Sequence, residues 1–372
     1  MSRGCRQKKP VCPGAFGRRL RCDHCPASIH QALTIYGENI HPMSMPIVFV
    51  MCTEAGGLEQ ESLLMVESIR RFAGKMKDTP IYSYQVREHT DVSSATRERL
   101  KALGVVHQKV VLNTEYPDYP LANKPLLGAY VEANLDAEII VFLDSDLVFF
   151  SEPKEFWLPD GCDLGIRPEH EKMIGSEGEA DANDSYWQHL YSLAGVTEPQ
   201  YVTTTVDRRK IKAFWNSGVV AVKRSAGVFT AWLETFSKLV EPGISVNKAN
   251  FYYEQSSLSA TICAQDIKIW NFSPGYNYPI HSHNNLIETE RKHSLKEIVC
   301  IHDHFYRSRE WYRERTWVKT LKRLYDFDRN NEAYRWFYQY LQQTHPRPNL
   351  VQSFLEQVLF LPVVRKLMPY RR

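Results

Sequence analysis

The sequence predicts an α/β protein, with a mostly parallel sheet flanked by helices and followed by a C-terminal helical extension. Two observations lead to this fold class. Strand and helix patterns alternate from residue 46 onward, which is typical of right-handed crossovers between parallel strands. Residues 139–143 form an unbroken apolar run, IIVFL, as expected of a buried strand.

The first half of the pattern alternates regularly up to this apolar run. Strands are expected at 47–52, 80–84, 105–112 and 139–143. Helices are expected from Leu63 to Phe72, from Ser93 or Ser94 to Leu103, and from Lys124 to Leu135. Residues 53–57, TEAGG, form the loop between the first strand and the first helix.

The second half is less regular. Residues 161–209 are rich in polar and acidic side chains and are expected to form an insertion on the acceptor side, a mobile lid or an ordinary long surface loop. The later elements expected are a strand at 215–222, helices at 226–240 and 252–263, an aromatic turn at 270–279 and a strand at 297–301. Two amphipathic helices, around 317–325 and 334–341, make up the extension.

Composition limits the classes of protein to consider. The 372 residues are 43% hydrophobic and 24% charged, so the chain can bury a substantial core. A formal net charge of +3 gives no general case for binding nucleic acid. No apolar stretch approaches the ~20 residues of a membrane span, and no secretory signal is evident. We therefore expect a cytoplasmic protein with reduced thiols.

Three regions are expected along the chain: a basic, cysteine-containing leader at 1–45, a main domain at 46–310 and the extension at 311–372. In the leader, Cys22 and Cys25 have the two-residue gap of a zinc or iron–sulfur site, which Cys5, Cys12 or His24 would complete. A flexible leader with incidental thiols is the alternative.

The buried run 139–143 ends in Asp144–Ser145–Asp146. Residues i and i+2 of a strand lie on one face, so both carboxylates project together where the strand leaves the sheet. Two adjacent like charges favour a shared divalent cation such as Mg²⁺ or Mn²⁺, which also holds phosphates. The alternative is that one Asp caps the next element and the other is solvated.

Several separate segments occur in an order that resembles one enzyme group. They are a Thr/Glu loop after the first strand, a Lys-bearing helix, the strand with Asp-x-Asp, Trp215–Asn216–Ser217–Gly218–Val219, a helix with Glu254–Gln255, Tyr276–Asn277–Tyr278 and a late strand ending at His302. Over residues 46–310 the chain resembles glycosyltransferase family 8 and its relatives of the GT-A fold, which has a Rossmann-like mixed sheet.

The resemblance implies a metal site formed by Asp144, Asp146 and His302, with His304 as the alternative to His302. An imidazole ligand suits Mn²⁺ better than Mg²⁺, so Mn²⁺ is favoured. Ser145, between the two acids, is expected on the side of the donor.

The resemblance also implies contacts with the substrate. Lys124 would approach the donor phosphates or sugar, and Asn216 the transferred sugar, with Gly218 letting the backbone pass close to it. Glu254 stands where the family usually has Asp, and Gln255 matches an active-site glutamine. Glu54 is expected either to contact the base or ribose of the donor or to cap the helix that follows it. Arg307 or Arg309 would bind the diphosphate.

Taken together, the resemblance implies a hexosyltransferase that uses a nucleotide-diphospho-sugar, a UDP-sugar being favoured. It implies retention of anomeric configuration and an acceptor hydroxyl on a carbohydrate, a lipid-linked compound or a protein. Nucleic acid is not expected as a partner. Residues 351–368, followed by Tyr370–Arg371–Arg372, would either dock peripherally on an anionic membrane or pack on the core of the protein.

Two other classes of protein share parts of this pattern. A sugar-nucleotide pyrophosphorylase normally has a basic Gly-rich loop after its first strand, and residues 53–57 lack basic side chains. A non-catalytic sugar-, nucleotide- or metal-binding protein is the second alternative. Convergence of Asp144, Asp146 and His302 in the fold would argue against it.

Overall fold

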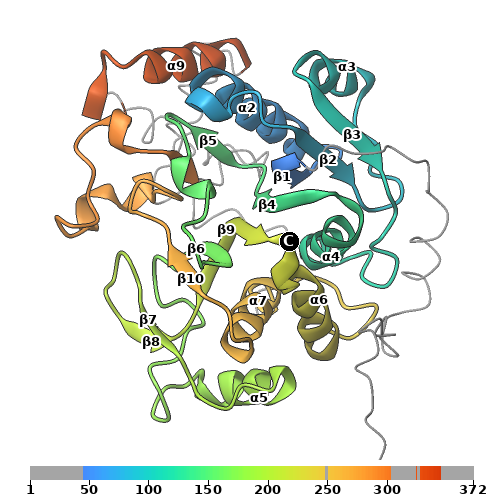
Figure 1. Ribbon diagram of the computed structural model, residues 1–372, viewed down its shortest axis with the longest axis vertical. Coiled ribbons are helices and arrows are strands. Elements are labelled where there is room, and N and C mark those ends of the chain that lie inside the picture. The colour runs from blue at the N-terminus through green and yellow to red at the C-terminus, as the bar shows by residue number, and fades with distance from the viewer. Residues whose placement is uncertain (1–44, 248–249, 303–323, 325–326, 345–372) are drawn as a thin grey trace, which may run out of the picture. The chain divides into compact units, whose positions relative to one another are not determined.

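A computed structural model describes residues 45–247, 250–302, 324 and 327–344. Its main sheet has seven strands in the order β10-β6-β9-β4-β1-β2-β3 (Figure 1). These strands are β1 (Met45–Cys52), β2 (Ile81–Gln85), β3 (Val105–Lys109), β4 (Ala137–Leu143), β6 (Leu164–Pro168), β9 (Trp215–Lys223) and β10 (Ile269–Asn271).

The strand directions confirm the expected mixed sheet. Strands β4, β1, β2 and β3 are parallel, and β10 is parallel to β6. Strand β9 runs antiparallel to both of its neighbours, β4 and β6. Because β6 therefore has the direction of β4, the carboxyl ends of β1, β4 and β6 lie at one edge of the sheet, together with the start of β9. Ligands of open α/β sheets bind at such an edge.

Helices cover both faces of the sheet. The α-helices of the described residues are α2 (Gly57–Phe72), α3 (Ser94–Ala102), α4 (Asn123–Asn134), α5 (Asp184–Ala194), α6 (Val228–Leu239), α7 (Tyr253–Ala264) and α9 (Glu332–Thr344). Figure 1 shows α2 on one side of the sheet and α4, α6 and α7 on the other. None of the helices in the described part of the chain combines the length and the apolar character that crossing a bilayer requires.

Alternation along the strands explains this layering. Phe49 and Val141 belong to the buried cluster that includes Ile69 of α2. Phe142, the next residue of β4, faces the other way and lies 6.2 Å from Phe229 of α6 between ring centroids. Successive strand residues thus anchor helices on opposite faces.

Helix α9 confirms the second predicted helix of the C-terminal extension. Its Phe337 is buried against Phe150, with ring centroids 6.1 Å apart, and Trp336 lies 5.3 Å from Phe72. The aromatic stripe therefore packs onto the main domain. Apart from Leu324, the first predicted helix lies outside the described residues, as do the leader cysteines and residues 351–368.

The interpretation of residues 161–209 as an insertion or surface loop was wrong for 164–168, which form β6 inside the main sheet. The strand pattern was hidden because Gly165, Arg167 and Pro168 interrupt it, and the pairing with β9 shifts register between Gly165 and Arg167. The rest of the segment contains α5 and β7 (Tyr201–Thr203), which pairs with β8 (Lys210–Lys212).

The expected late strand is shorter than predicted and lies outside the main sheet. It is β11 (Cys300–His302), which pairs antiparallel with β5 (Leu147–Phe149). Residues Leu295–Glu297 form a 3₁₀ turn instead. In the β11–β5 pair His302 lies opposite Leu147, so the register brings it next to Asp146.

Candidate active site

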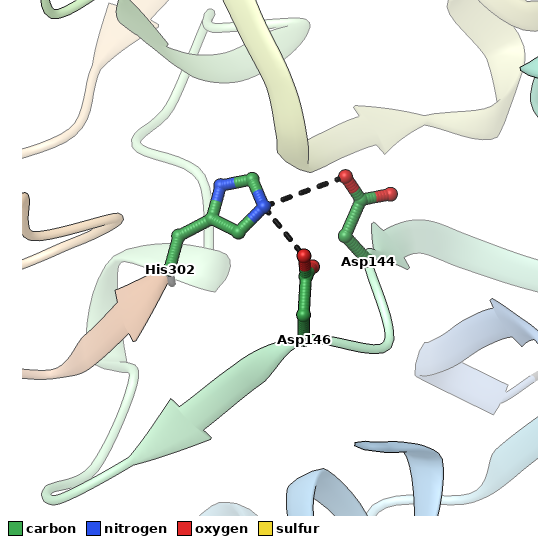
Figure 2. Close-up of side chains that lie close together, drawn as sticks. All are labelled: Asp144, Asp146 and His302. Carbon is green, nitrogen blue, oxygen red and sulfur yellow. Dashed lines mark ion pairs between the residues drawn. The ribbon is translucent and has the colours of Figure 1, made fainter. Parts of the chain in front are cut away.

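Asp144, Asp146 and His302 meet beyond the carboxyl end of β4 (Figure 2). His302 Nε2 lies 3.1 Å from Asp146 Oδ1 and 3.7 Å from Asp144 Oδ2. One ligand atom from each of the three residues lies within 4.8 Å of the other two. The structure thus brings together the three residues that the sequence predicted as metal ligands. The alternative ligand, His304, lies outside the described residues.

Backbone pairing on two sides holds the acidic pair in place. The Asp144 N–H donates to the carbonyl oxygen of Gly218 at 2.9 Å, which extends the β4–β9 ladder past the end of β4. Asp146 directly precedes β5, the partner of β11. Ser145, between them, is buried, and its Oγ lies 3.5 Å from Glu61 Oε2 of α2.

The charges around His302 suit a cation. Burial alone would lower the pKa of His302, but the Asp146 and Asp144 carboxylates outweigh it and raise the pKa above its usual value of 6.5. A metal ion would replace that proton, since a metal-bound imidazole must be deprotonated. Two carboxylate oxygens and one imidazole nitrogen form a donor set that fits Mn²⁺.

Lys124 joins Asp144 to the start of α7. Its Nζ lies 2.7 Å from Asp144 Oδ1, donates to Ser217 Oγ at 3.0 Å and lies 3.7 Å from Glu254 Oε1. Ser217 in turn donates to Glu254 Oε2 at 3.2 Å. The helix-borne lysine and the acid–glutamine pair therefore belong to one network with Asp144.

Glu254 is fully enclosed in this network. Burial raises the pKa of its carboxyl; Lys124 opposes the shift and the Asp144 charge adds to it. Asp144, Asp146 and Glu254 together carry more negative charge than Lys124 balances. A divalent cation would relieve this excess.

Gly218 lies against the imidazole of the site. A Cβ at this position would lie 2.5 Å from His302 Cε1, 2.7 Å from His302 Nδ1 and 3.0 Å from Asn216 Oδ1. The absent side chain therefore makes room for His302. The sequence predicted close approach at Gly218 but assigned it to the sugar.

Asn216 and Gln255 share a partner that the sequence analysis missed. Glu169 Oε2 accepts from Gln255 Nε2 at 2.5 Å and from Asn216 Nδ2 at 3.1 Å. Asn216 Oδ1 accepts from the Gly218 N–H at 2.9 Å. Glu169 directly follows β6, at the sheet edge that carries Asp144. Its place near the site could have been predicted from the sequence only if residues 164–168 had been recognised as a strand.

Glu54 is buried and paired with Arg87. Arg87 Nε and Nη2 donate to Glu54 Oε2 at 2.9 and 2.6 Å, and the Arg87 N–H donates to Oε1 at 3.1 Å. Both oxygens are thus engaged by one residue. Contact of Glu54 with a nucleotide stays a prediction, and Arg307 and Arg309 lie outside the described residues.

His170, next to Glu169, predicts how stability depends on pH. Its Nδ1 lies 2.7 Å from Thr205 Oγ1. Burial, then the charges of Arg167, His281 and His302, hold the pKa of His170 well below 6.5. Below pH 6.5 His170 binds a proton in the unfolded chain but stays neutral in the folded protein. As the pH is lowered, this group therefore reduces the free energy of unfolding by up to about 1.4 kcal/mol per pH unit.

Urea unfolding at pH 7.5, 6.5 and 5.5 measures this effect. We expect His170→Asn to reduce the loss of stability between pH 6.5 and 5.5 by about 1 kcal/mol. His189→Asn removes an exposed imidazole from α5 and serves as the control. An equal slope in the wild type and His170→Asn would contradict the prediction.

Several solved structures of glycosyltransferases resemble the chain. Mouse xyloside xylosyltransferase 1, in its apo form, is 13% identical with a TM-score of 0.41, over 69% of this chain and 98% of that chain. Galactosyltransferase LgtC, in complex with donor and acceptor sugar analogs, is 10% identical with a TM-score of 0.41, over 77% and 98%. GlyE of Streptococcus pneumoniae TIGR4 is 12% identical with a TM-score of 0.42, over 80% and 64%.

A search of curated protein sequences found no match. A protein-family model does match, over residues 49–266. This range is more than half of the 372 residues and contains the Asp144–Asp146 motif, Lys124, Asn216 and Gln255. The chain therefore belongs to the Rhodobacterales glycosyltransferase domain family.

Proposed function

We propose that this glycosyltransferase moves a hexosyl group from a nucleotide-diphospho-sugar, with a UDP-sugar favoured, to an acceptor hydroxyl with retention of configuration. The observation that carries the proposal is the convergence of Asp144, Asp146 and His302 beside Lys124. Two carboxylates, an imidazole and a lysine are suited to a diphosphate and its divalent cation.

Each side chain has a role in this scheme. Asp144, Asp146 and His302 would hold Mn²⁺, or Mg²⁺ in its place, which when bound neutralises charge on the departing diphosphate. Lys124 adds a fixed positive charge next to Asp144. Asn216, Glu254 and Gln255 would orient the sugar, so that the acceptor hydroxyl meets it in one geometry.

A screen of UDP- and GDP-sugars tests the proposal. We expect Mn²⁺-dependent release of UDP from one of the UDP-sugars, lost with EDTA and restored by adding Mn²⁺. The donor found in this way is then offered carbohydrate, lipid-linked and protein acceptors. Absence of binding and turnover with every donor would overturn the proposal.

A further inference from the structure

Glu169 is a buried carboxylate whose side-chain partners, among the described residues, are neutral N–H donors. Besides Gln255 and Asn216, the His170 N–H donates to its Oε1 at 2.8 Å. Glu169 is 7% exposed and, within the part of the chain that the structure describes, forms no ion pair. Burying a charge among amides is costly, and a neutral glutamine would fill the same space at a lower desolvation cost.

A carboxylate at this position determines how the neighbouring side-chain amides are oriented. An ionised carboxylate only accepts hydrogen bonds, so both side-chain amides must turn their NH₂ groups toward Glu169. The Asn216 carbonyl is then held by the Gly218 N–H. The Gln255 carbonyl oxygen forms no hydrogen bond with any described residue and is not among the fully buried polar atoms, so it can face a ligand.

We propose that Glu169 is a positioning residue that locks Gln255 with its carbonyl oxygen presented to the reacting sugar. The inference depends on the proposed transfer reaction. A sugar that loses its diphosphate develops positive charge, and a fixed carbonyl dipole pointing at it stabilises the transition state more than the bound donor. An unlocked amide would turn its NH₂ group to the sugar for part of the time.

Register explains how this lock forms. Arg167 of β6 pairs with Asn216 of β9, and Glu169, two residues further along, projects from the same face as Arg167. Gln255 lies in the first turn of α7, directly after Glu254. The lock therefore connects β6, β9 and α7 at the edge of the sheet where the donor is expected.

Glu169→Gln tests the proposal, because the new NH₂ group meets an N–H donor in either orientation: the His170 N–H at the Oε1 position, or the NH₂ groups of Gln255 and Asn216 at the Oε2 position. We expect kcat for Mn²⁺-dependent donor hydrolysis to fall roughly 10- to 100-fold, with the donor KM and Mn²⁺ affinity within about twofold of the wild type. Glu171→Gln, the same change at an exposed acid two residues along, is the matched control and should leave kcat unchanged.

A double-mutant cycle separates positioning from a structural role. If Glu169 acts through Gln255, adding Glu169→Gln to Gln255→Ala costs little further activity. Additive losses, or an unchanged kcat in Glu169→Gln, would overturn the role of Glu169. Turnover by the wild type in the same experiment would still support the proposed transfer reaction. Absence of turnover in the wild type would overturn the proposed function and the inference with it.

Discussion

Replacing Asp146 by Asn is expected to lower Mn²⁺ affinity and the rate of donor hydrolysis on the order of 100-fold each. The change keeps the size of the side chain but removes the charge that lies 3.1 Å from His302 Nε2. Losing one anionic ligand removes several kcal/mol of interaction with a divalent cation, and each tenfold in affinity corresponds to about 1.4 kcal/mol.

Calorimetric titration with Mn²⁺ and a donor-hydrolysis assay measure the two effects. Mn²⁺ should also raise the Tm of the wild type and leave that of Asp146→Asn unchanged, because a ligand stabilises only the state that binds it. Glu138→Gln, an exposed acid on the same strand β4, is the matched control. Equal Mn²⁺ affinities in the wild type and Asp146→Asn would show that Asp146 holds no cation.

Gly218→Ala is expected to disable the site through packing alone. The added methyl group would lie 2.5 Å from His302 Cε1, closer than real contacts allow, so the imidazole or the backbone must move. Overpacking of this kind costs about 1–3 kcal/mol of folding stability. Because His302 lies at the end of a three-residue strand, we expect its imidazole to be displaced. The displacement should lower Mn²⁺ affinity by roughly tenfold or more.

His302, which the added methyl group would contact, provides the control. In a His302→Ala background the methyl group meets no imidazole, so Gly218→Ala should cost much less stability there than in the wild type. This non-additivity, measured by urea unfolding, assigns the effect to the contact between the two residues. Equal costs in both backgrounds would place the strain elsewhere, against Asn216 or in the backbone.

The parts of the fold and site that could be predicted depend on local patterns. The apolar run 139–143 predicted β4, and the period of two in a strand predicted that Asp144 and Asp146 project together. His302 was predicted from the resemblance, because nothing local in its segment indicates which strand it pairs with. Its place opposite Leu147 comes from tertiary pairing.

What could not be predicted depends on pairings far apart in the chain. Glu169 was missed because β6 contains a glycine, an arginine and a proline in five residues, and its strand conformation comes from its neighbours in the sheet. The engagement of Glu54 by Arg87 was missed for a similar reason. Arg87 follows β2, and only the parallel pairing of β1 with β2 brings the two residues together.

The β11–β5 pair also has a consequence for the stage of folding at which the candidate cation site forms. Asp144 and Asp146 lie within the first half of the chain, whereas His302 follows Asp146 by 156 residues. Contacts between residues so far apart in sequence close large loops and tend to form late. We expect a folding intermediate that has already assembled β1 to β4 to bind Mn²⁺ weakly. Tight binding would then report the final docking step and not the collapse of the sheet.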